Sequence, residues 1–155
     1  MLKELFDKHK CDKGTEKHHY YKDYEQYFEK RREEPLNFLE IGTFKGASTR
    51  AFYDYFPNAN IYTIDIFERT DPKDLDILHE DRVHWMKADS MSATLPRNIK
   101  KEWDDIEFDF VIDNDGTKEE LYAKIDGLIV SNKITNPPAK STGTAQPLAI
   151  GANSF

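Results

Sequence analysis

Two glycines and two carboxylates have types and spacing that could bind a small ligand. Glu40, Gly42 and Gly46 form an E-x-G-x-x-x-G pattern, and Asp65 follows 23 residues after Gly42. A glycine turn lets a ligand approach the backbone closely, and a carboxylate can accept hydrogen bonds from both hydroxyls of a ribose. The pattern differs from a dinucleotide-binding turn, because Phe44 occupies the position of its second glycine.

The pattern favours a ligand that has a ribose and no phosphate. The glycine turn also lacks the Gly-Lys-Ser/Thr sequence of a phosphate-binding loop, since Ala47 follows Gly46. S-adenosylmethionine (SAM) meets these requirements, and acidic walls would favour its cationic sulfonium. The alternative is an ordinary strand–helix–strand unit in which the glycines only turn the chain.

The surrounding sequence predicts the elements that position these residues. Residues 37–41 form an apolar run typical of a buried parallel strand. Apolar residues then recur at helical spacing over 47–56, with Ser48 and Thr49 available to cap the helix, and 61–66 predict a second strand. A right-handed crossover between parallel strands places Gly42 and Asp65 at the carboxyl ends of those strands, where ligands bind.

Two further strands and a helix follow. Residues 82–89 predict a third strand with Val83 and Trp85, and as a further candidate Met86, buried, and it ends at Asp89. Asp89 is either an acceptor for the exocyclic amino group of adenine or a helix N-cap. Residues 108–113 predict a fourth strand ending at Asp113, and an apolar stripe from Leu121 to Ile129 predicts a helix after it.

The motifs LEIGTFKGAS, YTIDI, KADS and FDFVIDNDGT, in this order, resemble those of class I SAM-dependent methyltransferases. The resemblance implies an α/β, Rossmann-like fold: four parallel strands with helices on both faces of the sheet, truncated or atypical after the fourth strand. It implies SAM as cofactor, bound by residues at the strand ends. These are Glu40, Gly42, Thr43, Gly46, Ser48, Asp65, Ile66, Asp89, Ser90 and Asp113.

A second resemblance covers the N-terminal segment. DKG, HHY, YE and a Phe are similar to the start of sugar O-methyltransferases of macrolide and polyketide antibiotic pathways, where this segment is a lid over the cofactor. The resemblance adds Lys13 and Tyr20 to the cofactor residues. It makes lid or cleft residues of Asp12, Gly14, His18, His19 and Tyr24. The alternative for the tyrosines is packing, because Tyr20, Tyr24, Tyr27 and Phe28 recur at helical spacing.

The same resemblance identifies catalytic positions. In those enzymes an acid pair, Gly, Ser and His follow the fourth strand; an acid helps to hold magnesium, and the histidine is the general base. The matching residues here are Asn114 to Lys118, so Asp115 is expected to be catalytic and metal-binding, and Lys118 occupies the place of the base. A lysine with its ordinary pKa of ~10.4 accepts protons poorly at neutral pH. The further acid pair that completes the metal site has no match.

Domain boundaries follow from these segments: a lid at 1–34, a SAM-binding domain at 35–130 and a tail at 131–155. The tail carries three prolines and at most one weak strand, at 148–150. It is an extended arm, a partner-binding segment, or a product of truncation or a shifted reading frame. We expect no complete seven-stranded sheet, and therefore self-association as a homo-oligomer that covers the open edge.

Composition limits the partners. The chain has 155 residues, enough for one domain, and its net charge of −7 disfavours nucleic acid. No apolar run is long enough for a membrane span, and the single Cys11 suits a reducing cytoplasm. The expected function is O-methylation of a small or sugar-like hydroxyl compound. The alternative is a catalytically degenerate SAM-binding or scaffold domain that works through self-association.

Overall fold

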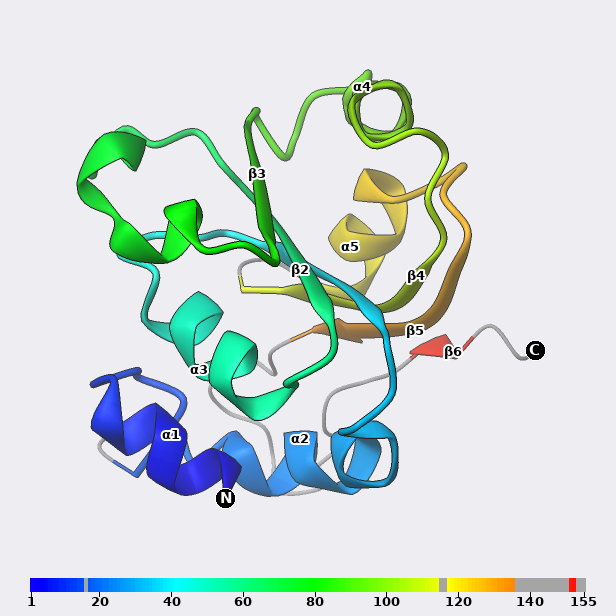
Figure 1. Ribbon diagram of the computed structural model, residues 1–155. Helices are drawn as coiled ribbons and strands as arrows, with labels where there is room; N and C mark the ends of the chain where they lie inside the picture. Colours follow the sequence, from blue (N-terminus) through cyan, green and yellow to red (C-terminus); the bar gives the residue numbers. More distant parts are fainter. Residues whose placement is uncertain (16, 115–116, 136–150, 153–155) are drawn as a thin grey trace.

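A six-stranded sheet forms the centre of the molecule (Figure 1). The computed structural model describes residues 1–15, 17–114, 117–135 and 151–152. The strands are β1 (Asn37–Ile41), β2 (Asn60–Asp65), β3 (Val83–Lys87), β4 (Phe108–Asp113), β5 (Val130–Thr135) and β6 (Gly151–Ala152), in the order β3-β2-β1-β4-β5-β6. The first five are parallel, and β6 pairs antiparallel with β5. This arrangement confirms the predicted α/β, Rossmann-like fold.

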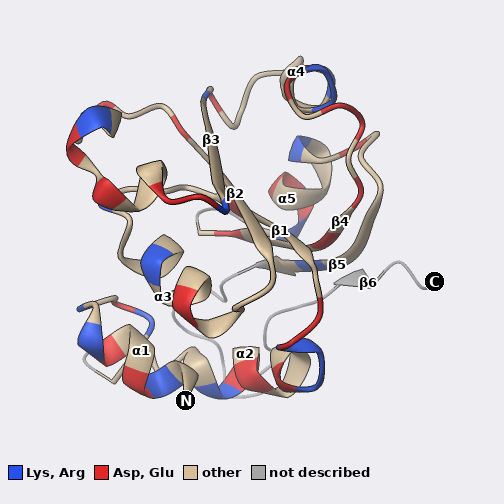
Figure 2. Ribbon diagram, in the orientation of Figure 1, with Lys and Arg blue, Asp and Glu red and all other residues tan. Residues whose placement is uncertain are grey.

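Helices cover both faces of the sheet. On one face lie α1 (Leu2–Lys8), α2 (Tyr21–Phe28) and α3 (Ala47–Tyr55), and on the other lie α4 (Leu95–Glu102) and α5 (Lys118–Lys124) (Figure 1). Short 3₁₀ helices lie at Glu29–Arg31 (η1), Pro72–Asp74 (η2) and Asp76–His79 (η3). Figure 2 shows that charged residues lie mainly on the helices and loops, while the strands are mostly uncharged.

The alternation of β1 divides the core between the two faces. Phe38 packs with the aromatic side chains of α1, α2 and α3, whereas Leu39 packs with residues of α4 and α5. The ring of Phe28 on α2 lies 4.9 Å from that of Phe110 on β4 and 5.2 Å from that of Phe56. These contacts confirm the packing interpretation of the aromatic stripe for Tyr24 and Phe28, which are fully buried.

Three local expectations were wrong. The helix predicted to continue to Ile129 ends at Lys124, and Ile129 is exposed. A fifth strand, β5, follows at once and pairs with β4, so the parallel sheet does not stop at four strands. Trp85 is 36% exposed, because β3 is an edge strand of the sheet. The weak strand expected at 148–150 lies outside the described residues.

Candidate functional site

A cleft of about 900 Å³ opens at the carboxyl ends of β1 and β2. In the strand order, β1 lies between β2 and β4, so β2 and β3 extend the sheet to one side of β1 and β4 and β5 extend it to the other. Ligands of open α/β sheets bind at such a topological switch point. Seven of the expected cofactor residues line the cleft: Lys13, Tyr20, Gly42, Thr43, Ser48, Asp65 and Ile66.

Both glycines of the turn after β1 have backbone conformations that favour glycine. Gly42 has a φ of 100° and Gly46 a φ of 80°, in the left-handed region. A Cβ on Gly42 would lie 3.2 Å from the Cβ of Asn114, and one on Gly46 would lie 2.8 Å from the Cγ2 of Ile77. The turn therefore leaves backbone exposed to a ligand at Gly42 and lets helix α3 begin directly at Gly46.

Glu40 lies beneath this turn and is fully buried. Its carboxylate accepts hydrogen bonds from the hydroxyls of Ser48 and Thr49 and, at 3.0 Å, from Nδ2 of Asn114. Burial raises the pKa of Glu40, although the charge of Lys13 and these three donors act in the opposite direction. The expectation that Ser48 and Thr49 cap α3 was wrong, because the N-cap is Gly46 and both hydroxyls donate to Glu40.

Asp65, at the end of β2, joins the two loops of one wall. Its Oδ2 accepts from the backbone N–H of Phe44 and its Oδ1 from that of Phe67, both at 2.8 Å. Phe44 and Phe67 have φ values of 50° and 54°, a left-handed conformation that is uncommon for such residues. The carboxylate is therefore fixed in the cleft wall with further lone pairs available for a ligand. Ile66 beside it is 40% exposed.

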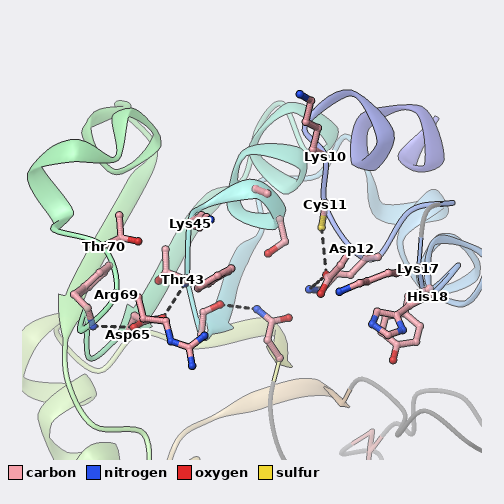
Figure 3. Close-up of a pocket in the computed structure, with 18 of the residues that line it drawn as sticks. Lys10, Cys11, Asp12, Lys17, His18, Thr43, Lys45, Asp65, Arg69 and Thr70 are labelled. Atoms are coloured by element: carbon pink, nitrogen blue, oxygen red, sulfur yellow. Dashed lines mark hydrogen bonds and ion pairs between the residues drawn. The ribbon is translucent and has the colours of Figure 1, made fainter.

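Residues 10–13, 17, 18 and 20 form the opposite wall (Figure 3). Asp7 of α1 orders this segment, because its Oδ1 accepts from the N–H and the hydroxyl of Thr15, at 2.8 and 2.9 Å. The rings of His18 and Tyr20 stack at 4.9 Å. Lys13 is buried in this wall, with its Nζ 3.4 Å from Oδ1 of Asp12. The segment that the sequence assigned to a lid thus contributes directly to the cleft.

The cleft is lined by more cations than acids. Its acids are Asp12, Asp65 and Glu68, and its lysines and arginine are Lys10, Lys13, Lys17, Lys45 and Arg69. The expectation of acidic walls around a sulfonium was therefore wrong for the cleft as a whole, although Asp65 supplies one carboxylate at the strand ends.

Asn114 connects the turn to β4. Its Nδ2 donates to the carbonyl of Gly42 at 2.6 Å as well as to Glu40, and its backbone N–H donates to the carbonyl of Ile41 at 3.0 Å. The side chain also lines the cleft. Sequence reasoning placed Asn114 only at an acid-pair position of the catalytic motif and assigned it no contact.

Several expected site residues lie away from the cleft lining. Asp89 does not line the cleft, and its Oδ1 accepts from the N–H of Met91 at 2.8 Å. The alternative of a helix N-cap at Asp89 was wrong, because α4 begins at Leu95 and its N-cap is Thr94. Ser90 does not line the cleft either. Asp113 is fully buried, and its Oδ2 accepts from Nζ of Lys124 at 2.8 Å.

The catalytic positions are only partly described. Lys118 is exposed at the first turn of α5, where Thr117 and Glu120 form a capping box, and its Nζ lies 5.6 Å from the centre of the Tyr122 ring. Asp115 lies outside the described residues. Within the described part of the chain, no group of three or more His, Cys, Asp or Glu side chains is placed to hold a metal ion.

Other cleft residues carried little signal in the sequence. Phe44 and Lys45 lie inside the glycine turn, and Phe67, Arg69 and Thr70 lie in the loop after β2. The residues that directly follow an acid at the end of a strand often face the ligand. This rule, applied to Asp65, would have identified Phe67, Arg69 and Thr70. The positions of Phe44 and Lys45 depend on the left-handed φ of Phe44, which composition does not indicate.

Comparisons with known proteins support the resemblance. No protein-family model matches the chain. It is 29% identical over 120 residues to the 8-demethyl-8-(2-methoxy-α-L-rhamnosyl)-tetracenomycin-C 3′-O-methyltransferase of Streptomyces olivaceus, an alignment covering 73% of this chain and 29% of the relative. The chain thus spans under a third of the length of that relative.

Solved structures share the fold. The methyltransferase MycE of the mycinamycin biosynthetic pathway, in complex with Mg, SAH and mycinamycin VI, has a TM-score of 0.70 at 23% identity, covering 87% of this chain and 38% of MycE. Fibrillarin of Methanococcus jannaschii has a TM-score of 0.54 at 13% identity, covering 66% of this chain and 45% of fibrillarin. The chain has the fold of the class I SAM-dependent methyltransferases and, among them, resembles the sugar O-methyltransferases of antibiotic pathways.

Proposed function

We propose that the chain forms the cofactor-binding part of a SAM-dependent O-methyltransferase acting on a hydroxyl of a small or sugar-like substrate. The observation that carries this proposal is the placement of Gly42 and Asp65 in one cleft at the carboxyl ends of adjacent parallel strands. The similarity to the tetracenomycin-C 3′-O-methyltransferase, and the SAH and Mg bound by MycE, support the choice of cofactor and reaction.

The residues of the cleft fit the parts of SAM. The carboxylate of Asp65 would accept hydrogen bonds from the ribose hydroxyls, and the backbone at Gly42 would lie against the amino-acid part. The buried ammonium of Lys13 would pair with the cofactor's carboxylate. When bound, SAM would supply a methyl group on a cationic sulfur that a substrate hydroxyl can attack.

The chain's own contribution is to align the reactants and exclude water. The wall formed by residues 10–13, 17, 18 and 20 lies opposite the glycine turn and would cover a ligand. Lys118 remains the proposed base position, together with Asp115. The exposed site of Lys118 on α5 means that an acceptor, or a rearranged loop, would have to bring the reacting hydroxyl to it. The described residues do not form a magnesium site, so no step is assigned to a metal.

The alternative of a degenerate scaffold domain has no support in the comparisons. The similar proteins include one named O-methyltransferase and a methyltransferase in complex with SAH and mycinamycin VI. The cleft of this chain also retains the expected turn and carboxylate in contact with each other, since Phe44 of the turn donates to Asp65.

Calorimetry with SAM and with S-adenosylhomocysteine (SAH) tests the cofactor assignment. Asp65→Ala should weaken binding of either by about 1–3 kcal/mol, the scale of hydrogen bonds to a charged group. Asp126→Ala is the matched control, because Asp126 is exposed and does not line the cleft. Equal affinities of the wild type and Asp65→Ala for SAH would remove Asp65 from the site and the proposal with it. Transfer of the methyl group to a panel of hydroxyl compounds then tests the reaction.

A further inference from the structure

Four exposed cations gather at the cleft without acidic partners. They are Lys10 and Lys17 on one wall and Lys45 and Arg69 on the other, and Figure 3 shows the two groups on opposite sides of the cleft. Within the part of the chain that the structure describes, none of them has an acid at ion-pair distance. We refer to these four residues as the cationic rim.

The two cations beside the glycine turn are held in place. The Nζ of Lys45 lies 5.4 Å, and the Cζ of Arg69 5.8 Å, from the centre of the Phe44 ring. Both distances suit cation–π attraction. Phe44 is half-exposed, and its backbone N–H is bonded to Asp65, so the ring that carries these cations is itself fixed to the cleft wall. Lys45 and Arg69, the half of the rim beside the glycine turn, thus both lie against the same ring of the wall.

The proposed cofactor does not account for this charge. SAM carries a sulfonium and an ammonium against a single carboxylate, and the proposed function already assigns the buried Lys13 of the cleft lining to that carboxylate. Four more cations near a cationic ligand would repel it. Their presence therefore points to a second ligand in the same cleft.

The surplus is local. The whole chain has a net charge of −7, and some cations outside the cleft pair with acids, as Arg31 does with Asp109 and Arg50 with Glu80, at 2.9 and 2.8 Å. A cleft with positive charge on an otherwise acidic protein concentrates anions and repels cations.

We propose that the methyl acceptor of this cleft carries an anionic group, a carboxylate or a phosphate, in addition to its hydroxyl. That the ligand is a methyl acceptor rests on the proposed function, whereas its negative charge is inferred from the cationic rim alone. The anion would lie between the two walls at the mouth of the cleft, and the cofactor would lie deeper, against Gly42 and Asp65.

The test compares three probes that share a sugar ring: D-glucuronate, D-glucose 6-phosphate and neutral D-glucose. Each is titrated into the full chain by ligand-observed NMR at low ionic strength, both with and without saturating SAH. At least one of the two anions should bind, D-glucose should not bind detectably, and added salt should weaken anion binding. The better of the two anions identifies the acceptor's charged group.

A double variant locates the binding. Lys45→Gln with Arg69→Gln should weaken binding of the preferred anion about tenfold, the scale of two partly screened ion pairs. SAH affinity should stay the same or rise. Arg97→Gln with Lys101→Gln is the matched control, because it removes the same charges from exposed positions of α4 outside the cleft.

The outcomes separate the two proposals. Equal binding of D-glucose and both anions, or an unchanged anion affinity in the Lys45/Arg69 variant, would overturn the anionic acceptor. A failure of SAH to bind would overturn the proposed function. In that case the titrations of the probes without SAH would still test whether the cationic rim binds an anion.

Discussion

At the scale of single residues, the site depends on a carboxylate that was expected to bind the cofactor but lies beneath the cleft, outside its lining. Glu40 is fully buried, yet three side chains donate to it, and one of them, Asn114, also holds the carbonyl of Gly42. The group therefore fixes the start of α3 and the end of β4 relative to the glycine turn. Because burial raises its pKa, the folded protein favours the protonated form more than the unfolded chain does.

Stability should therefore depend on pH through Glu40. A raised folded-state pKa contributes stability below the unfolded pKa, near the ordinary value of 4.5, and this contribution is lost as the pH rises through the folded pKa. Glu40→Gln cannot ionise. The free energy of unfolding of the wild type, relative to that of Glu40→Gln, should thus increase as the pH falls from 7 toward 4.5. Urea denaturation at several pH values measures the difference. A constant difference would show that folding does not shift the pKa of Glu40, and the opposite trend would show that folding favours its anion.

Sequence patterns predicted the residues of the site that are fixed by strand ends. Gly42 and Asp65 follow directly from the strand–helix–strand unit, because a strand's last residue must lie at the edge of the sheet. The cationic rim could not be predicted in this way. Lys45 and Arg69 come together only because Phe44 and Phe67 have left-handed backbones, which bring their loops to the same carboxylate.

At the scale of elements, the junction of β4, α5 and β5 differs most from the sequence expectation. The helix stripe continues to Ile129, but Gly127 has a φ of 93° and the chain enters β5 at Val130. The strand VSNKIT is mostly polar, so its composition led to its assignment to the C-terminal tail rather than to the sheet. Its two apolar residues, Val130 and Ile134, are nevertheless buried, because they pack beside β4, which is distant in sequence.

A buried ion pair joins two of these elements. Lys124 of α5 and Asp113 of β4 lie 2.8 Å apart with side chains 4% and 0% exposed. Lys124→Met should lower the free energy of unfolding by about 3–5 kcal/mol, since it leaves a carboxylate buried without its cation. The double variant Asp113→Asn with Lys124→Met should recover part of this loss. Urea denaturation measures both, and a loss below about 1 kcal/mol in Lys124→Met would contradict the assignment.

At the scale of the whole molecule, the sheet has two unequal ends. One end is β3, with Trp85 partly exposed, and the other is the two-residue β6, which pairs with β5 only at Asn132 and Lys133. Exposed Ile129 lies next to the second end. The structure shows no helix long and apolar enough to span a membrane within the described residues. Among the described residues, β6 covers only part of the edge of β5, and a partly covered edge beside an apolar side chain favours contact with another copy.

We therefore expect self-association through the β5 end of the sheet. Multi-angle light scattering should show a mass above that of the monomer, 18.1 kDa, at about 100 μM, and Ile129→Lys should shift the distribution toward the monomer. Met91→Lys is the matched control, because it adds the same charge at an exposed residue beyond β3, at the other end of the sheet. A monomer at this concentration, or an equal effect of both variants, would be evidence against the predicted interface.

The central position of β1 has a consequence for the protein while it is being synthesised. A nascent chain that has released β1, α3, β2 and β3 from the ribosome can pair three strands, but the side of β1 that receives β4 has no partner until Phe108–Asp113 emerges. During that interval the glycine turn also lacks Asn114, which ties it to the sheet. An open central strand is a template for pairing with other chains. The period of greatest aggregation risk therefore ends with the same residues that complete the cleft.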